Sequence, residues 1–463
     1  MREYLVESDD TAVALIPLDK AAFADWLAGL PESRRAWVIA ANFTAESGAV
    51  CPMPGDDGRL TAVLVGLGDD DDPWAFAALP AKLPPGLYRL ARPIERRAAE
   101  WATLGWQLAT YAFRRYKSGE AKPWPRLVWP DNADRAAVLR AAEAIALVRD
   151  LINTPAADLG PAELAAAAEA LAKRHGASLR VIVGEGLLAE NFPAIHAVGR
   201  AAAHHRQPRL IDLAWGETDA PKVTLVGKGV CFDSGGLDLK PSSNMKLMKK
   251  DMGGAAHVLG LASMIMAAGL PVRLRVLIPA VENAVAGDSM RPLDVLSTRK
   301  GVTVEIGNTD AEGRLILADA LWEAASESPA LLIDVATLTG AARTALGPDL
   351  PALFANDDRL AADLLAAGEA EGDPLWRLPL FKPYRRMLDS KVADLTNASD
   401  SPHAGAITAA LFLQEFVPAG IPWVHLDIMA WNAASRPGRP EGGEAIGLRA
   451  LHALIADRFG PEK

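Results

Sequence analysis

Short apolar runs separated by polar loops make up the first part of the chain. The runs at residues 12–17, 36–39 and 62–66 have the length and composition of β-strands. Prolines and tryptophans then interrupt regular structure between residues 122 and 130. The alanine-rich segment 134–152 follows with apolar residues at helical spacing. We therefore expect a domain boundary near residue 132 and a connecting helix directly after it.

From residue 155 onward, apolar strands alternate with longer segments of helical periodicity. The expected strands are 178–183, 210–215, 222–226, 273–278, 302–306 and 331–335, and the expected helices are 163–175, 255–268, 312–326 and 444–459. Such alternation predicts a mixed or largely parallel sheet covered by helices on both faces. The fold class is therefore α/β in two domains. A smaller N-terminal α/β domain covers residues 1–132, and a larger domain with the connecting helix covers residues 133–463.

Several features favour a soluble, cytoplasmic protein without membrane association. The charged first ten residues lack the apolar core of a signal peptide. The apolar stretch 255–272 contains His257, two glycines and Pro271, so we interpret it as a buried helix rather than a membrane span. Cys51 and Cys231 lie far apart and form no C-x-x-C pattern, which is typical of a reducing compartment.

Three loops of the larger domain are rich in polar residues for their apolar surroundings. They read VGKGVCFDSGGLDLKP at 226–241, MKKDMGGAA at 248–256 and GNTDAEGRL at 307–315. Catalytic groups of α/β sheets gather where strands end in loops. We therefore expect these three loops to meet at one edge of the sheet.

Asp310 and Glu312 stand two residues apart in the third loop. In an extended segment, alternate side chains point to the same side, so both carboxylates would face one site, joined by Arg314 if the extension continues. The alternative is an ordinary helix start, with a cap, Glu312 in the first turn and apolar residues after it. This pair alone leaves both interpretations open.

The charged residues of the other two loops also have ordinary structural explanations. Lys228 follows a buried strand, where a lysine needs an ionic partner, and Asp233 is the candidate partner. Asp251 directly precedes a helical segment and could serve as its cap. Ser234 has no histidine near it in the sequence, so we assign it to a turn rather than to nucleophilic catalysis.

Taken together, the three loops bring four carboxylates toward one sheet edge, which is unfavourable unless cations bind between them. Two divalent cations would neutralise the carboxylates and would keep Lys228 neutral enough to act as a nitrogen ligand. Bridging carboxylates suit two metals about 3.5–4 Å apart, as in two-metal hydrolases. The chain has no H-E-x-x-H motif, no phosphate-binding P-loop and no G-x-S-x-G elbow.

These motifs resemble those of the leucyl aminopeptidase family, also called cytosol aminopeptidases. NTDAEGRL at 308–315 is similar to the hallmark of that family, and VGKGVCFDSGG with Lys240 and MKKDMGGAA occur in the same order. Further similar segments are RDLINTP, TLTGA, GDPLWRLPL, AGAITAALFL and WVHLDI. The resemblance covers the chain from around residue 135 to residue 463, whereas the N-terminal domain resembles the family only loosely.

The resemblance implies a two-metal-dependent aminopeptidase that hydrolyses the N-terminal residue from peptides, with a metal-bridging water as the nucleophile. The implied metal ligands are Lys228, Asp233, Asp251, Asp310 and Glu312. Lys240 is implied to polarise the scissile carbonyl, and Arg314 to hold a bicarbonate ion that acts as general base. The bicarbonate site would be completed by Lys240, Leu338 and Gly340. The expected metals are zinc or manganese, with magnesium or cobalt as alternatives.

The resemblance also implies a pocket for the substrate's first side chain, formed by Met248, Asn308, Thr337 and Met429. Many family members continue HLDI with Ala-Gly, whereas this chain has Met429 and Ala430. A methionine lining the pocket would take up space there and favour small or slender first residues. Alternatively, Met429 packs into the core.

The expected partners are peptide substrates and further copies of the chain, because family members are typically homohexamers. Two other functions compete with this interpretation. Some family members also bind DNA, but a net charge of -10 disfavours nucleic acid as a partner here. A two-metal hydrolase acting on phosphoesters would need a similar carboxylate cluster, but the order of the motifs argues against it.

Overall fold

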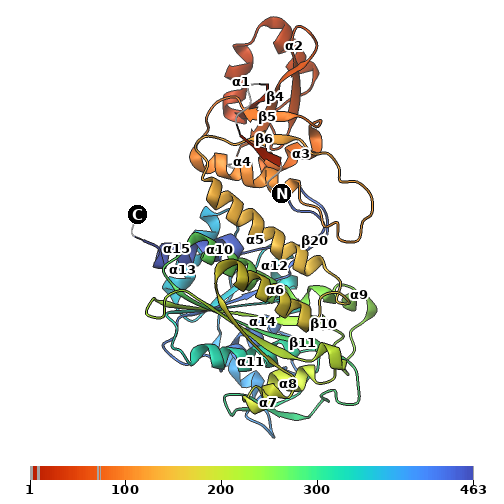
Figure 1. Cartoon of the computed structure of the whole chain (residues 1–463), viewed down its shortest axis with the longest axis vertical. Helices are drawn as coiled ribbons and strands as arrows, with labels where there is room; N and C mark the ends of the chain where they lie inside the picture. Colours follow the sequence, from red (N-terminus) through yellow and green to blue (C-terminus); the bar gives the residue numbers. More distant parts are fainter. Residues whose placement is uncertain (1–3, 8–10, 70–71, 73, 462–463) are drawn as a thin grey trace. The chain divides into compact units, whose positions relative to one another are not determined.

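The computed structural model describes residues 4–7, 11–69, 72 and 74–461, and the chain divides into two compact units (Figure 1). Unit 1 consists of Met1–Ala146 and Ala434–Glu441, and unit 2 of Leu147–Ala433 and Gly442–Lys463. The sequence suggested a boundary near residue 132, whereas the units divide inside helix α5 (Arg135–Asn153). Residues 1–3 and 8–10 of the charged N-terminal stretch lie outside the described residues.

Unit 1 is built on a six-stranded sheet in the order β1-β6-β5-β2-β4-β3. Its strands are β1 (Leu5–Val6), β2 (Val13–Asp19), β3 (Val50–Pro54), β4 (Leu60–Gly68), β5 (Leu87–Leu90) and β6 (Arg126–Val128). Its helices include α1 (Lys20–Ala28), α2 (Glu32–Ala40), α3 (Leu79–Lys82) and α4 (Arg96–Ala109). Strand β2 pairs in parallel with β4 and β5, and the edge strand β3 is antiparallel to β4. Strands β2 and β4 confirm two of the predicted strands.

The apolar run at 36–39 is helical, so the strand predicted there is wrong. The run forms the end of α2, in which only Val38 is buried among the described residues. Periodicity alone cannot separate a short apolar run in a strand from one in a helix. Glu32 lies in the first turn, where an acidic side chain favours the helix, and two arginines with good helix propensity follow it.

Unit 2 contains a nine-stranded sheet in the order β16-β15-β18-β14-β9-β11-β8-β7, with β10 paired to β11 off this path. These strands are β7 (Ser178–Val183), β8 (Arg209–Trp215), β9 (Lys222–Gly227), β10 (Gly229–Asp233), β11 (Arg273–Asn283), β14 (Leu331–Ala336), β15 (Ala352–Ala355), β16 (Trp376–Arg377) and β18 (Trp423–Asp427). Strands β18, β14, β9 and β11 are parallel to one another, whereas β8 and β15 run antiparallel to their neighbours. The predicted mixed sheet is confirmed.

Helices flank this sheet on both faces (Figure 1). Helix α10 packs against α6 and α15, while α11 packs against α8 and α14. The helices of unit 2 include α6 (Pro161–His175), α7 (Gly186–Ala189), α8 (Pro193–Gly199), α9 (Ser242–Met245), α10 (Gly253–Ala268), α11 (Glu312–Ala325), α12 (Gly340–Leu346), α13 (Asp358–Ala370), α14 (Gly405–Gln414) and α15 (Leu448–Phe459). Smaller sheets join β12 (Val295–Ser297), β13 (Thr303–Glu305) and β17 (Leu395–Thr396), and β19 (Trp431–Asn432) with β20 (Gly442–Gly443).

The central helix α10 is apolar on all sides because it is buried on all sides. Every residue from Gly253 to Met266 is buried. Within the described residues, Met248–Ala268 is the single helical stretch apolar and long enough to cross a membrane, and most of it is packed inside unit 2. The structure thus explains its composition by core packing, as the prediction of a buried helix required.

Candidate active site

The charged loops of unit 2 meet where its central parallel strands end. Strand β9 ends directly before Lys228, and β10 ends at Asp233. Strand β14 is followed by Thr337, and the adjacent β18 ends at Asp427. Because β9, β14 and β18 are parallel neighbours, these carboxyl ends lie at one sheet edge, where ligands of α/β sheets bind.

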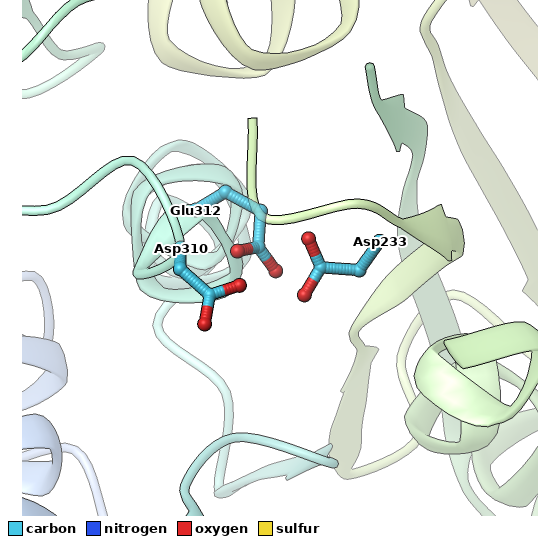
Figure 2. Close-up of side chains that lie close together, drawn as sticks. All are labelled: Asp233, Asp310 and Glu312. Atoms are coloured by element: carbon cyan, nitrogen blue, oxygen red, sulfur yellow. The ribbon is translucent and has the colours of Figure 1, made fainter. Parts of the chain in front are cut away.

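Three carboxylates come together at this edge (Figure 2). Asp233, Asp310 and Glu312 each place one oxygen so that the three oxygens lie within 4.8 Å of one another. Helix α11 begins at Glu312, so the extended segment suggested by the alternation is absent. The turn before the helix nevertheless brings Asp310 to the same site. The helix start and the shared carboxylate site are therefore both present, although the sequence analysis treated them as alternatives.

Two lysines are bonded into this cluster. The Nζ of Lys228 lies 2.8 Å from Asp251 Oδ2 and 3.1 Å from Glu312 Oε1. The Nζ of Lys240 lies 2.8 Å from Asp233 Oδ2 and also contacts Asp310. The sequence paired Lys228 with Asp233, which is wrong, because Lys240 occupies that position. Burial lowers the pKa of both lysines, but the surrounding carboxylates outweigh it and raise both pKa values overall.

Asp251 faces the site rather than capping the helix that follows. It lies in the 3-10 helix η4 (Met248–Met252), and α10 has Met252 at its N-cap with no side-chain cap bond. Its Oδ1 accepts a hydrogen bond of 2.7 Å from the hydroxyl of Thr337. Asp251 is 3% exposed and paired with Lys228.

The carboxylates of the cluster repel one another in a site with little water. Burial raises the pKa of Glu312 to about 8, and the charge of Asp233 adds to this shift. Burial also raises the pKa of Asp310 to about 6, again with a contribution from Asp233. Burial likewise raises the pKa of Asp251. The arrangement therefore holds more negative charge than its own residues neutralise favourably.

This donor set fits divalent cations. One oxygen each of Asp251, Asp310 and Glu312 is buried and lacks a well-oriented hydrogen-bond donor among the described residues. Each of these oxygens lies within ion-pair distance of a lysine ammonium group. Carboxylate oxygens with a lysine nitrogen beside them are suitable ligands for ions such as Mg²⁺, Mn²⁺ or Zn²⁺. Cations between these groups would supply the missing partners and relieve the repulsion.

Two of the loops are locked together by hydrogen bonds that do not involve the cluster itself. The hydroxyl of Thr309 donates to the carbonyl of Gly235 at 2.6 Å and accepts from the N–H of Asp238 at 2.8 Å. The N–H of Thr309 donates to the Asp238 carboxylate at 2.7 Å. Gly235 has φ = +91°, a conformation that favours glycine. The loop carrying Asp233 and the loop carrying Asp310 are thereby fixed relative to each other.

A cavity of about 410 Å³ opens onto the cluster. All the ligand, catalytic and pocket residues implied by the sequence line it, with the exception of Glu312. Met429 lines the cavity and is half-buried, so its side chain is not enclosed in the core. Leu338 and Gly340 contribute to the same wall.

Arg314 is a buried cation beside the cavity. It is 8% exposed, and its Nη1 donates a hydrogen bond of 2.7 Å to the carbonyl of Asn397, while its Nε has no partner among the described residues. Burial lowers the pKa of Arg314 to about 10, although Glu312 and Asp427 oppose the shift. The guanidinium therefore has donors left for an anion such as the expected bicarbonate.

Sequence reasoning missed three polar residues that organise this site. Asn283 donates 2.9 Å to Asp233 and 3.4 Å to Glu312. The Asn397 side chain accepts from the N–H of Gly307 at 2.8 Å and donates to the carbonyl of Asn308 at 2.7 Å. The signal for Asn283 was a polar residue at the end of an apolar strand. No local signal marks Asn397, which lies far from the acidic loop in the sequence.

Asp427 is the third, and it holds the loop after β14. Its carboxylate accepts hydrogen bonds from the N–H groups of Leu338 at 2.9 Å and Thr339 at 3.2 Å, and from the Thr339 hydroxyl at 2.6 Å. An acidic residue ending a buried strand was the available signal.

Lys250, which is 6% exposed, also lines the cavity. Burial lowers the pKa of Lys250 to about 8, with Asp251 opposing this and two nearby cations adding to it.

Comparison with known proteins identifies the family. Residues 146–452 match the catalytic domain of the cytosol aminopeptidase family, and residues 13–130 match the M17 aminopeptidase N-terminal domain. The chain belongs to the cytosol aminopeptidase family and is a metal-dependent aminopeptidase, a hydrolase of peptide bonds. The N-terminal domain, which resembled the family only loosely by motif, is thus part of the same architecture.

Individual relatives agree with this assignment along nearly the whole chain. The crystal structure of the cytosol aminopeptidase from Coxiella burnetii superimposes with a TM-score of 0.94 at 51% identity, covering 99% of this chain and 100% of that one. The bottromycin maturation enzyme BotP in complex with Mn gives a TM-score of 0.87 at 38% identity, covering 96% and 99%. A probable cytosol aminopeptidase of Leifsonia xyli subsp. xyli is 40% identical over 463 residues, covering 94% of this chain and 92% of the relative.

Proposed function

We propose that this aminopeptidase acts through two divalent cations held in the acidic cluster and removes the N-terminal residue of peptides by attack of a water held between them. The observation that carries the proposal is the convergence of three carboxylates within 4.8 Å of one another beside a cavity that two of them line. Asp233 and Glu312 would each be ligands of both cations. Lys228 with Asp251 would complete one site, and Asp310 the other.

The cations, when bound, would act as Lewis acids that activate the water and accept the substrate's free α-amine. The chain's own residues have separate tasks. Lys240 reaches the cluster from the cavity side, so its ammonium would polarise the scissile carbonyl and stabilise the oxyanion that develops there. Arg314 would orient a bicarbonate ion as general base, with the wall formed by Leu338 and Gly340 supporting it. Asp427 keeps that wall in place.

The family and the set of ligand atoms also suggest the identity of the metals, the location of the protein and its assembly. Zinc or manganese suits the mixed oxygen and nitrogen ligands, and magnesium or cobalt are alternatives. The relative BotP has been solved in complex with Mn, which supports manganese. Homologues are named cytosol aminopeptidases, which supports a cytoplasmic location. We also propose a homohexamer as the working assembly, as the family resemblance implies.

The dependence on a free α-amine provides the test. With manganese or zinc present, the protein should hydrolyse leucine amide but leave N-acetyl-leucine amide intact, because acetylation removes the group that anchors the substrate. An Asp310→Ala variant should bind less metal, measured by elemental analysis after gel filtration, and should lose activity in parallel. Equal rates on the free and acetylated amides would overturn the proposal.

A further inference from the structure

Lys250 is a buried cation in the cavity that the proposed mechanism does not use. It lies in η4, lines the cavity and is 6% exposed. Its ammonium has no hydrogen-bond acceptor or ion-pair partner within the described part of the chain, and the adjacent Asp251 pairs with Lys228 instead. Removing an ammonium group from water without a partner is unfavourable. Its position therefore indicates a negatively charged ligand.

A second cation without an ionic partner lines the same cavity. Arg343 lies in α12, and its Nη1 is 3.9 Å from the Sδ of Met429, which belongs to the wall assigned to the substrate's first side chain. It forms no ion pair with any residue that the structure describes, and it is among the cations whose charge acts on Lys250. The two cations thus belong to one region of the cavity.

The other cations around the cavity have an ionic partner or a proposed role, and Arg314 is the one assigned to bicarbonate. Lys228 and Lys240 are paired with carboxylates of the cluster. Asp427 accepts hydrogen bonds from the loop after β14, so its carboxylate is directed there. Lys250 and Arg343 are therefore two cations at this cavity that lack an acidic partner among the described residues, and a negatively charged group of the substrate would match them.

We propose that Lys250 and Arg343 form a carboxylate-binding subsite that selects peptides with aspartate or glutamate as the first residue. The proposal deepens the proposed function, on which it rests, by naming a substrate class. Met429 is expected to narrow this pocket, which would suit a slender acidic side chain. A charged hydrogen bond to a desolvated carboxylate is strong, and the uncharged amide analogue would leave the buried ammonium unpaired.

The test compares glutamate amide with glutamine amide on the manganese-loaded enzyme. These substrates differ by one side-chain charge and have no C-terminal carboxylate. We expect kcat/KM to favour glutamate amide by about tenfold or more. Lys250→Gln should bring this ratio close to one, and Arg343→Gln should reduce it. A wild-type ratio of kcat/KM for glutamate amide over glutamine amide near one, with leucine amide still hydrolysed, would rule out the subsite but not the proposed function. If no amide is hydrolysed at all, the proposed function itself is wrong.

Lys249→Gln is the matched control, because Lys249 is the neighbouring lysine but its Nζ donates to the carbonyl of Asn153 at 2.6 Å. It removes the same charge next to Asp251, and the glutamate preference should persist in it with the same metal content. The C-terminal carboxylate of a dipeptide is the other source of an anion. If Lys250→Gln abolishes a preference for dipeptides over dipeptide amides but leaves the glutamate-to-glutamine ratio unchanged, the assignment to the first side chain is wrong.

Discussion

Lys240 and Arg314 are charged groups at the site that are not proposed to bind metal. Changing either to alanine should therefore lower kcat while both cations still bind. Loss of a group that stabilises an oxyanion typically reduces kcat by about 10²–10³-fold. Steady-state kinetics on leucine amide together with metal analysis would check this. Loss of both cations from Lys240→Ala would show that Lys240 serves the metal site instead.

His257 in the core helix α10 should make the protein less stable in acid. Its Nδ1 lies 2.7 Å from the carbonyl of Gly253, and its Nε2 accepts from the N–H of Ile446 at 3.1 Å, so the folded state holds it neutral. Burial lowers the pKa of His257 to about 4 from 6.5. Because the folded pKa is the lower one, the unfolded chain takes up the proton first as pH falls. Stability is thus full above pH 6.5 and is lost progressively toward pH 4.

Urea unfolding between pH 4 and pH 7.5 would measure this loss, expected to be about 2–3 kcal/mol from this residue. In His257→Gln, that part of the pH dependence should disappear, whatever the variant's absolute stability. Substituting the exposed His403 in the same way should leave the slope as in the wild type. An unchanged slope in His257→Gln would contradict the assignment.

At the residue scale, the sequence indicated which charges belong to the site but not how they pair. The four carboxylates of the three charged loops were together enough to predict a metal site, whereas Asp310 and Glu312 alone were not. Their pairing depends on side-chain directions that arise only when η4 and α11 pack against the strand ends. For that reason Lys240, and not Lys228, is the partner of Asp233.

Gly313 in helix α11 lies in close contact with the side chain of Lys228, which follows strand β9. A Cβ at this position would lie 2.6 Å from Cε and 2.7 Å from Nζ of Lys228. Gly313→Ala should therefore displace Lys228 from Asp251 and Glu312, weakening metal binding and activity, although alanine favours the helix itself. Metal titration calorimetry and kcat would measure both effects.

Gly287→Ala is the matched control, because a Cβ there meets nothing within 4 Å. It should bind metal and hydrolyse leucine amide like the wild type. If Gly313→Ala also behaves like the wild type, the close contact with Lys228 does not determine the geometry of the site.

At the element scale, long periodic segments were predictable and short ambiguous ones were not. Strand β14 and helix α10 matched the apolar pattern because all of the strand and nearly all of the helix are buried. Helix α2 was mistaken for a strand because four apolar residues fit either structure. The last helix was expected from residue 444 but begins at Leu448, since Gly447 adopts φ = +71° and Glu444 is bonded to Arg149 and Asn432.

At the scale of the whole molecule, the proposed homohexamer predicts the mass of the assembly in solution. If the homohexamer proposed above is the working assembly, the 49.1 kDa chain should sediment as six copies. Sedimentation velocity at several concentrations would determine the mass. A single species of one chain that retains full activity would contradict the hexamer without affecting the chemistry proposed for each site.

The return of residues 434–441 to unit 1 could not be predicted, because no local sequence pattern indicates which domain a loop belongs to.

We propose that the carboxylate cluster is catalytically active only with divalent cations between its oxygens. The most direct test removes all metal with a chelator, verifies this by elemental analysis, and then titrates manganese or zinc back. Bound metal and hydrolysis of leucine amide are measured on the same samples. We predict no activity without metal and full recovery when two ions are bound per chain. Full activity in a sample verified to be free of metal would show that the cluster does not need divalent cations for catalysis.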